Sequence, residues 1–381
     1  MRLVPALIVL SALSFPAIAQ LDTIRMPPVA TRLSDADSAR ILAELQLRES
    51  DKPVREMKGW TKPKTVALLT DSPERTAWLR EVAPGVDIIP IPRPMDALKL
   101  VTANVDALVG VCNKPVVALA PKAKWVHVGS AGVNECLDSP RIASGEVLLT
   151  NMQRVYGPPM AEHVIALTFA LARNFPYFDA LQRKGEWNQT GLPFENFMEL
   201  QGKTMLIVGL GGIGTEVAKR AQALGMNVIA TRNSGREGPS YVSYVGLSSE
   251  LPDLISKADV VMNATPLTPG TDNLFNAAMF ARMKPTAFFI NVGRGQQVNQ
   301  PDLIAALEKK VIAGAAIDVA DPEPLPKDHP LWKAPNLIIT PHVSSFSGER
   351  MDRFWVVLRE NLKRYVAGDK MLSVVDVKRG Y

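Results

Sequence analysis

The feature that most constrains this chain is an apolar run that ends in a glycine-rich turn, Met205-Leu-Ile-Val-Gly-Leu-Gly-Gly-Ile-Gly214. Residues 215–224 then have the pattern of a helix, and a second strand over 227–230 follows at the distance expected in a βαβ unit. In such a turn Gly209 permits the tight bend, Gly211 lets the backbone approach a diphosphate, and Gly214 lets the helix pack closely on the strand. The diphosphate would bind the free N–H groups at the helix start, beside Gly212 and Ile213. The spacing predicts a dinucleotide site; the alternative is a turn that serves packing alone.

Alternating strands and helices predict the fold class. Before the glycine turn we expect strands at 65–69, 107–111 and 125–128, and from the turn onward at 204–208, 226–230, 259–263, 286–290, 313–317 and 336–340. Helical stretches separate these strands, which is the pattern of parallel sheets. We therefore expect an α/β protein with two Rossmann-like domains, each with a parallel sheet, and an active site in the cleft between them.

The predicted domain boundaries follow from the same pattern. Residues 161–345 would form the dinucleotide-binding Rossmann domain, and residues 64–160 with 346–381 the substrate (catalytic) domain. Residues 20–63 would be an N-terminal extension with one helix around 34–47, and a long helix is expected over 160–173. An apolar stripe at helical spacing predicts a last helix that crosses back to the first domain: Phe354, Val357, Leu358, Leu362 and Tyr365.

The start of the chain has the parts of a secretory signal. Residues 1–19 contain an early arginine, an apolar stretch and small residues at Ala17 and Ala19, so we expect cleavage after Ala19 and export, most simply to a bacterial periplasm. The alternatives are an uncleaved tail or anchor, and a cytoplasmic protein if the signal is not used. No later segment is long and apolar enough to span a bilayer, so we expect no integral span in the mature chain.

Composition and cysteine content narrow the function classes. The net charge of +5 is spread along the chain, and no basic run with interleaved aromatic residues indicates nucleic-acid binding. The sequence contains no GxSxG, HExxH or clustered Cys/His spacing, so we expect neither a serine hydrolase nor a metal centre. Only Cys112 and Cys136 are present; one disulfide can form in an oxidising compartment, but two core thiols are the favoured interpretation.

Charged residues follow successive strands in the C-terminal third. Arg294 comes after the strand at 287–291, Asp318 ends the next strand, and His342 ends the last. Ligands bind at such strand ends in open α/β sheets. Hydride exchange between a nicotinamide and a carbonyl carbon needs a proton donor or acceptor and a cation that holds an anionic substrate. These residue types at these places favour that chemistry, and the alternative is a structural ion network.

At these residues a family resemblance becomes specific. Asn291-Val-Gly-Arg-Gly295, Asp318-Val-Ala-Asp-Pro-Glu-Pro-Leu-Pro326 and Thr340-Pro-His-Val-Ser344 resemble the signatures of the D-isomer-specific 2-hydroxyacid dehydrogenases, and their spacing is most similar to the glyoxylate/hydroxypyruvate reductase branch. The resemblance extends over about residues 64–381 through Ser130-Ala-Gly-Val-Asn134, Ala161-Glu-His163, Gly185-Glu-Trp187 and Arg379-Gly-Tyr381.

The resemblance implies a role for each site residue. His342 would be the acid/base, Glu323 would pair with it, and Arg294 would bind the substrate carboxylate and carbonyl. Ala131 and Gly132 would offer backbone N–H groups to the carboxylate. Asp318, Thr265 and Pro266 would lie on the cofactor side, and a homodimer is implied. An imidazole beside a carboxylate keeps its proton to higher pH, as ketone reduction requires. We expect His127, His163 and His329 to be packed, structural or surface residues. Asn134 stands where family members usually carry Asp.

The cofactor can be argued from the second strand of the βαβ unit. An NAD site usually presents Asp or Glu to the adenosine ribose about 20 residues beyond the glycines. Here the position holds Thr231, followed by Arg232, and either Ser234 or Arg236 could join Arg232 in binding a 2′-phosphate. NADP is therefore the expected cofactor, with NAD as the alternative.

The sequence thus favours an NAD(P)-dependent reductase of small 2-keto acids. A formate dehydrogenase-like enzyme is disfavoured, because Glu323 stands where that branch usually carries Gln. An exported protein that binds a cofactor or carboxylate with little or no turnover is the alternative from another class, since compartments outside the cytoplasm are not an obvious supply of reduced NADP.

Overall fold

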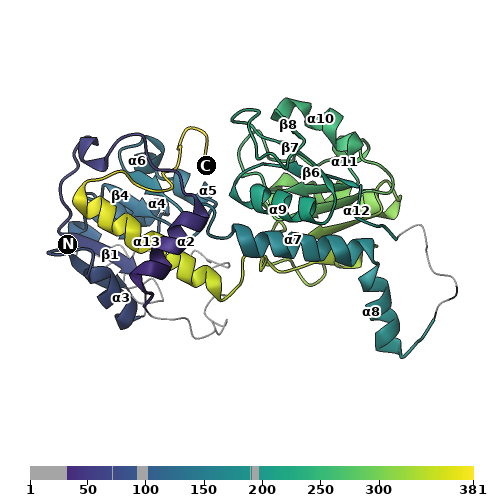
Figure 1. The fold of residues 1–381 in the computed structure, drawn as a ribbon, viewed down its shortest axis with the longest axis horizontal. Helices are drawn as coiled ribbons and strands as arrows, with labels where there is room; N and C mark the ends of the chain where they lie inside the picture. The colour runs from purple at the N-terminus through teal and green to yellow at the C-terminus, as the bar shows by residue number, and fades with distance from the viewer. Residues whose placement is uncertain (1–31, 71, 92–101, 189, 191–196) are drawn as a thin grey trace, which may run out of the picture.

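Two α/β lobes stand side by side, each built on an all-parallel sheet (Figure 1). A computed structural model describes residues 32–381 except 71, 92–101, 189 and 191–196, so the expected export signal at 1–19 lies outside the described residues. One sheet has five strands and the other seven. The predicted fold class is confirmed.

The first lobe holds the five-stranded sheet. Its strands are β1 (Thr65–Leu69), β2 (Asp87–Ile91), β3 (Ala107–Val109), β4 (Trp125–His127) and β5 (Leu148–Thr150). Its helices are α2 (Asp35–Leu45), α3 (Pro73–Arg80), α4 (Lys114–Leu119), α5 (Asn134–Leu137), α6 (Pro140–Ala143) and α13 (Glu349–Ala367). The strand order β2-β1-β3-β4-β5 reverses direction between β1 and β3, where such sheets form a ligand crevice.

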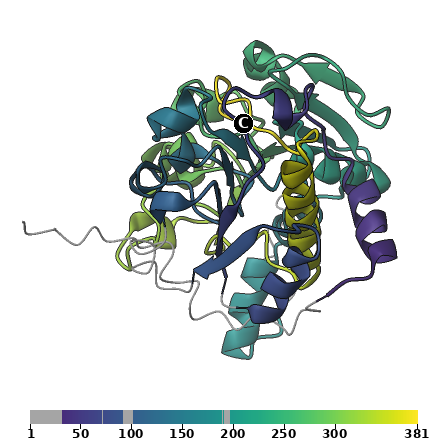
Figure 2. The same cartoon turned by 90° about the vertical axis from the view of Figure 1, so that its left-hand side faces the viewer.

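The last helix of the chain packs in the first lobe, as its apolar stripe predicts. Helix α13 lies beside α2, and Leu358, Leu362 and Tyr365 share one buried core with Ile41 and Leu45 of α2 (Figures 1 and 2). The described part of the predicted N-terminal extension is therefore packed on this lobe. Helix α13 ends at Gly368, whose left-handed backbone (φ +76°) closes the last turn.

The second lobe holds the seven-stranded sheet. Its strands are β6 (Thr204–Val208), β7 (Asn227–Thr231), β8 (Tyr244–Gly246), β9 (Val260–Asn263), β10 (Phe288–Asn291), β11 (Gly314–Ile317) and β12 (Leu337–Ile339). Its helices are α7 (Gly157–Ala172), α8 (Phe175–Lys184), α9 (Gly212–Ala223), α10 (Leu251–Leu254), α11 (Ala277–Phe280) and α12 (Gln300–Glu308). The order β12-β11-β10-β9-β6-β7-β8 reverses between β6 and β9, and β6 runs directly into the glycine turn.

Helix starts are explained by short polar side chains. Among the described residues, five helices begin after a residue whose side-chain oxygen accepts a backbone N–H of the first turn: Ser34, Ser72, Asn113, Asn276 and Asn299. This cap satisfies a donor that the helix itself leaves free. In α3, α4 and α12 a proline also follows within the first two helical positions, where its missing N–H costs nothing.

Three strands of the described residues were not predicted from the sequence. The unpredicted strands are β2, β5 and β8, of which β5 and β8 have three residues each and β2 contains Pro90. Pro90 argues against a strand at β2, and the proline is tolerated there because β2 lies at an edge of its sheet; β8 is also an edge strand. The nine predicted strands are present, with ends that differ from the expected ranges by two residues or fewer.

The two cysteines form a disulfide, so the expectation of two core thiols is wrong. Cys112 follows β3 and Cys136 lies in α5, with Cα atoms 4.9 Å apart. These segments are 24 residues apart in sequence, and only the packing of the first lobe brings them together. His127, by contrast, is fully buried in β4 as expected, and burial lowers its pKa to about 3.

Within the described ranges, no helix combines the length and apolar character that crossing a bilayer requires.

Candidate functional site

A large cleft lies at the carboxyl ends of both parallel sheets. Strand ends of the first lobe and of the second lobe line it together: Leu69, Gly110 and Val128 from the first, and Val208, Thr231, Ala264, Val292, Asp318 and Ile339 from the second. Ligands bind at these edges of open α/β sheets. Every site residue that the sequence predicts lines this cleft except Gly214, which packs against Gly209 and Ile207 behind the turn.

The glycine turn has the geometry that a diphosphate requires. Gly209 has a φ of +101°, and a methyl group there would lie 3.0 Å from the backbone of Ala264 and Thr265. A methyl at Gly214 would overlap the carbonyl oxygen of Gly209, whereas the same position at Gly211 faces open space. Helix α9 begins directly behind Gly211 with no side-chain cap, so its first N–H groups are available to an anion. The turn therefore fits a dinucleotide diphosphate, with Gly212 and Ile213 also lining the cleft.

Arg154, which the sequence analysis did not single out, lies against this turn. A methyl group at Gly212 would lie 2.8 Å from Cγ of Arg154, so the arginine takes the space that a side chain at Gly212 would need. Its backbone is left-handed (φ +64°), and its exposed side chain lines the cleft. Among the described residues, no acidic group forms an ion pair with it. An arginine in the loop before a helix has no local pattern that would mark it in the sequence.

The two arginines expected near the adenosine ribose have different surroundings. Arg232 follows β7 and lines the cleft; its guanidinium donates to Ser234 Oγ at 2.9 Å and to the Glu237 carbonyl at 2.9 Å. Arg236 instead forms an ion pair with Glu250 at 2.7 Å and donates to the Tyr244 hydroxyl. Of the alternatives left open by the sequence, the structure thus pairs Arg232 with Ser234. Thr231 is buried at the end of β7.

His342 and Glu323 form a hydrogen-bonded pair at the cleft. His342 Nδ1 lies 2.7 Å from Glu323 Oε2, and the other carboxylate oxygen accepts the Ala320 N–H at 3.0 Å. Burial raises the pKa of Glu323, but the hydrogen bonds from His342 and Ala320, together with the positive charges of His342 and Arg294, outweigh it and hold that pKa below its ordinary value. His342 also adopts a left-handed backbone (φ +55°), a conformation that is uncommon outside glycine and clusters at functional sites.

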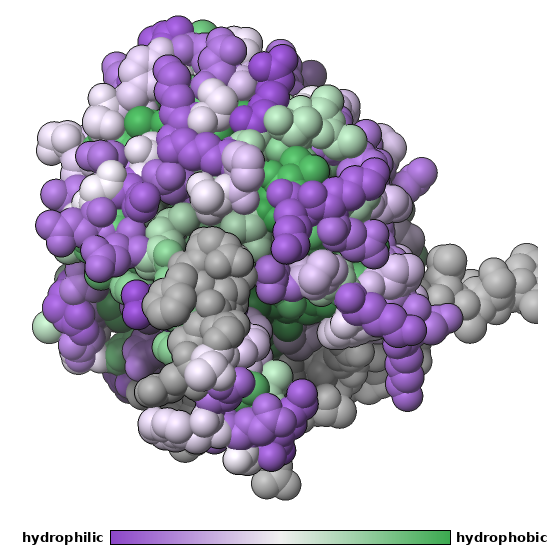
Figure 3. Space-filling view, turned by 90° about the vertical axis from the view of Figure 1, so that its right-hand side faces the viewer, coloured by the Kyte–Doolittle hydropathy of each residue, from purple (hydrophilic) through white to green (hydrophobic). Residues whose placement is uncertain are grey.

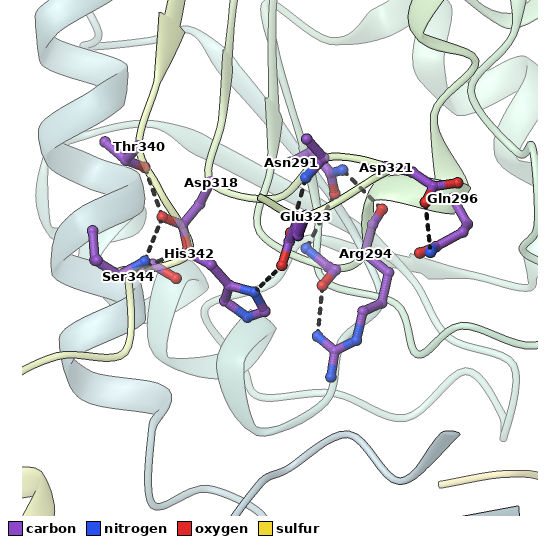
Figure 4. Close-up of polar contacts among 12 residues, drawn as sticks. Asn291, Arg294, Gln296, Asp318, Asp321, Glu323, Thr340, His342 and Ser344 are labelled. Carbon is purple, nitrogen blue, oxygen red and sulfur yellow. Dashed lines mark hydrogen bonds and ion pairs between the residues drawn. The ribbon is translucent and has the colours of Figure 1, made fainter. Parts of the chain in front are cut away.

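Asp318 holds the loop that carries His342. Its fully buried side chain accepts the Thr340 hydroxyl at 2.6 Å and the N–H groups of Val343 and Ser344 at 2.9 and 3.0 Å (Figure 4). His163 on α7 approaches the hydrogen-bonded Asp318 and Thr340, with its Nε2 3.1 Å from Thr340 Oγ1. Both carboxylate oxygens of Asp318 therefore contact this loop, and its expected contact with the nicotinamide remains a prediction.

Arg294 lies beside the His342–Glu323 pair, and its side chain reaches the first lobe. The side chains of Arg294 and His342 point toward the same side of the loops that carry them (Figure 4). Burial lowers the pKa of the Arg294 guanidinium, and the nearby charges of Glu323 and Glu135 oppose that shift, so the group stays protonated. A methyl group at Gly132 would overlap Nη2 of Arg294, so only glycine leaves room for this approach. The structure thus brings the predicted carboxylate loop and the predicted cation together.

A buried amide network, also missed from the sequence, fixes the backbone of Arg294. Asn263 Nδ2 donates to Asn291 Oδ1 at 2.9 Å and to Gln297 Oε1 at 2.8 Å. Gln297 accepts the Arg294 N–H at 2.8 Å and donates to Thr265 Oγ1 at 2.7 Å. Full burial makes each of these hydrogen bonds costly to lose. A sequence signal existed: Asn263 and Asn291 each end an otherwise apolar strand.

The remaining histidine stands apart from the chemistry. His329 accepts the Leu331 N–H at the start of a short 3-10 turn over 330–333, consistent with the structural role expected for it.

Comparisons with known proteins agree with this geometry. Residues 165–344 match the family model described as D-isomer specific 2-hydroxyacid dehydrogenase, NAD binding domain. A glyoxylate reductase of Thermofilum pendens is 32% identical over 286 residues, which cover 74% of this chain and 82% of that protein. A glyoxylate/hydroxypyruvate reductase B of Escherichia fergusonii is 35% identical over 251 residues, which cover 65% of this chain and 77% of that protein.

A solved structure shares both lobes. The NADPH-dependent glyoxylate/hydroxypyruvate reductase of Sinorhizobium meliloti, in complex with NADP and sulfate, superposes with a TM-score of 0.70 at 28% identity. The match covers 84% of this chain and all of that chain. With the glycine turn, the His342–Glu323 pair and Arg294 in one cleft, these similarities establish that the chain belongs to the D-isomer specific 2-hydroxyacid dehydrogenase family.

Proposed function

We propose that this protein is an NAD(P)-dependent oxidoreductase that reduces small 2-keto acids to D-2-hydroxy acids. The observation that carries the proposal is the His342–Glu323 pair, 2.7 Å apart, beside the half-buried Arg294 in the cleft that also holds the glycine turn. An acid, a cation and a cofactor cradle at one place are the groups that carbonyl reduction needs.

Each residue would act on a defined atom. Arg294 binds the substrate carboxylate and polarises its carbonyl, and the N–H groups of Ala131 and Gly132 bind the same carboxylate from the other lobe. His342 donates a proton to the carbonyl oxygen as it becomes a hydroxyl, while Glu323 orients the imidazole and stabilises its positive charge. When bound, the reduced nicotinamide supplies the hydride that the carbonyl carbon accepts.

Glyoxylate and hydroxypyruvate are the proposed substrate class. Relatives carry these names, and Gly132 places no side chain beside the Arg294 guanidinium. The test is NADPH oxidation at a fixed enzyme concentration with glyoxylate, hydroxypyruvate and larger 2-keto acids. Saturable turnover with the small acids supports the proposal. Tight cofactor binding with no turnover on any of them would favour the carboxylate- or cofactor-binding alternative.

NADP is the proposed cofactor, with NAD as a weaker alternative. Thr231 offers no carboxylate to the ribose, and Arg232 is held at the cleft by Ser234, where its charge can meet a 2′-phosphate. Two solved relatives, from Sinorhizobium meliloti and Xanthobacter autotrophicus, contain NADP or NADPH. The ratio of kcat/KM for NADPH over NADH measures this preference directly.

A homodimer is also proposed. Helix α8 extends away from the second lobe (Figure 1), and the face at that end of the molecule shows apolar atoms between charged ones (Figure 3). Phe175, the first residue of α8, is 57% exposed and Trp187, which follows that helix, is 93% exposed; aromatic side chains are enriched at protein interfaces. Light scattering after size exclusion should give a dimer, and Phe175→Ser with Trp187→Ser should weaken it. A monomeric wild type at micromolar concentration would refute the dimer.

Export to an oxidising compartment is the last part of the proposal. It rests on residues 1–19, and the Cys112–Cys136 disulfide supports it because disulfides persist outside the reducing cytoplasm. N-terminal sequencing of the native protein with cell fractionation tests it. A mature chain that begins at Gln20 is expected; an intact Met1–Ala19 on a cytoplasmic protein would overturn the location.

A further inference from the structure

A hydrogen bond crosses the cleft beside the expected substrate site. Asn134, the first residue of α5, lies two positions after Gly132 of the Ala131–Gly132 loop in the first lobe. Its Nδ2 donates to the carbonyl oxygen of Leu267 at 2.6 Å, in the loop that follows β9 of the second lobe. The two residues are 133 positions apart in sequence, and both line the cleft.

We propose that Asn134 is an interlobe latch: its hydrogen bond to Leu267 sets the distance between the Ala131–Gly132 loop and Arg294, and so positions the substrate carboxylate. The inference rests on the proposed function and names a positioning residue for it. Asn134 touches neither the reacting atoms nor the cofactor in this role; it acts through the loop that precedes it.

On the first-lobe side, α5 cannot move independently of the sheet. The disulfide joins Cys136, two residues after Asn134, to Cys112 behind β3. The carboxylate loop is held as well: Asn151 Nδ2 donates to the Ala131 carbonyl at 2.7 Å, and Ser130 Oγ donates to the Gly132 carbonyl at 2.6 Å. A displacement of Asn134 would therefore move the whole Ala131–Gly132 loop with it.

On the second-lobe side, the acceptor lies on a braced loop. The carbonyl of Pro266, next to Leu267, accepts Gln297 Nε2 at 3.0 Å and the Thr271 hydroxyl at 2.6 Å. The same Gln297 side chain accepts the Arg294 N–H. Gln297 thus links the residue before the latch acceptor to the backbone of Arg294, so a contact that fixes the Leu267 loop relative to the first lobe also limits the movement of Arg294.

The latch would set the distance between the Ala131–Gly132 loop and Arg294, and these two groups are already in close contact. A methyl group at Gly132 would overlap the Arg294 guanidinium, so the loop and the cation already lie at contact distance. The C-terminal segment lies over the same joint, where a methyl at Gly380 would meet Leu137 and Thr268, one from each lobe, at 3.6 Å. A small opening of the joint would therefore separate the two groups that bind one carboxylate.

The latch depends on an amide rather than on side-chain size. Asn has an N–H donor, whereas an ionised Asp of the same shape has only acceptors and would face the Leu267 carbonyl oxygen with like partial charge. Asn134→Asp therefore removes the latch with the smallest change in volume, and Asn134→Leu removes the donor without adding charge. Asn276, which caps α11 away from the cleft lining, provides a matched control because Asp caps helices as well as Asn.

The experiment measures KM and kcat for the keto acid, the Kd of NADPH by fluorescence, and the radius of gyration of the free protein by X-ray scattering. For Asn134→Leu we expect KM to rise about three- to tenfold, and for Asn134→Asp more than tenfold at pH 7.5, with the NADPH Kd within twofold of the wild type. Both variants should show a larger radius of gyration. Lowering the pH toward 5 should reduce the KM excess of Asn134→Asp over the wild type, because a protonated carboxyl donates again. The KM of the wild type, measured at each pH, accounts for any effect of the nearby charged groups, which are Glu135 on α5, Arg294 and Arg379.

Two results would overturn the latch. An unchanged KM and radius of gyration in both variants would show that the hydrogen bond sets nothing, and an equal loss of NADPH binding would show a general structural role. Asn276→Asp should match the wild type in every measurement. Failure of the proposed function is separate, since it would appear as no keto-acid turnover in the wild type, and the scattering comparison would still decide whether Asn134 holds the lobes together.

Discussion

Gly132→Ala is the sharpest test of how substrate and cation meet in this cleft. The added methyl would overlap Nη2 of Arg294 and lie 3.0 Å from its guanidinium carbon, whereas ordinary contacts begin at 3.4 Å. The carbon must then retreat by at least 0.4 Å, and the overlapping nitrogen by about 1 Å or more. This movement has a cost, because Nη1 of the guanidinium donates to the Gly293 carbonyl at 2.8 Å and that hydrogen bond must lengthen or break.

A displacement of about 1 Å at a substrate-positioning group can cost about 10²-fold in rate, or about 2.7 kcal/mol. We therefore expect kcat/KM for the keto acid to fall about 100-fold in Gly132→Ala, with the NADPH Kd unchanged because the glycine turn is untouched. Steady-state kinetics and fluorescence titration measure the two quantities. Gly270→Ala is the matched control, since a methyl there finds its nearest neighbour, Thr268 Oγ1, at 3.9 Å. A Gly132→Ala enzyme within threefold of the wild type in kcat/KM would refute the reasoning.

Four further predictions follow from the site. His342→Ala should lower kcat about 10²–10⁴-fold, the usual loss of a general acid, and near-normal turnover would contradict its assignment. Thr231→Asp combined with Arg232→Ala should shift the ratio of kcat/KM for NADPH over NADH toward NADH. A wild type that already prefers NADH would show that this turn does not select the cofactor. Arg154→Gln should raise the Kd of NADPH and that of NADH by a similar factor of about ten, because both cofactors carry the diphosphate, whereas Arg232→Gln should raise the Kd of NADPH alone. An unchanged Kd for both cofactors in Arg154→Gln would place Arg154 outside the diphosphate site. Hydrogen bonds hold the pKa of Glu323 below its ordinary value, so its contribution to stability is present above the unfolded carboxyl pKa and is lost as pH falls through the folded one. Glu323→Gln should therefore lower the Tm near pH 7, with a difference from the wild type that shrinks below about pH 4; a constant difference would contradict this sign.

The predictions that held rest on local chemistry. The strand at 204–208 and the turn at Gly209–Gly214 follow from an apolar run and from glycines at positions that no other residue can occupy, as the contacts of Gly209 and Gly214 show. The charged residues Arg294, Asp318 and His342 were recognisable because each follows a strand, and parallel strands bring their carboxyl ends to one edge. Periodicity and turn chemistry are properties of a short segment, so a sequence displays them directly.

Other features depend on partners that a segment does not contain. From the sequence, Ser234 and Arg236 were alternative partners of Arg232, and only the structure shows that Arg236 forms an ion pair with Glu250 while Ser234 accepts from Arg232. The role of Gln297 depends likewise on Asn263 and Thr265 meeting it at the end of β9. Polar side chains commit to whichever donor or acceptor lies within about 3 Å, and that distance is set by packing.

The sequence by itself therefore determined the two parallel sheets, the place of the dinucleotide turn and the positions of Arg294, Asp318 and His342 after successive strands, while the roles of the site residues remain predictions. Only the tertiary structure decided the Cys112–Cys136 disulfide, the contact of Arg154 with Gly212 and the hydrogen bond from Asn134 to Leu267. Each of these joins segments that are 24 to 133 residues apart. Such pairs leave no periodic trace in the chain, because their geometry exists only after segments that are distant in sequence have packed against one another.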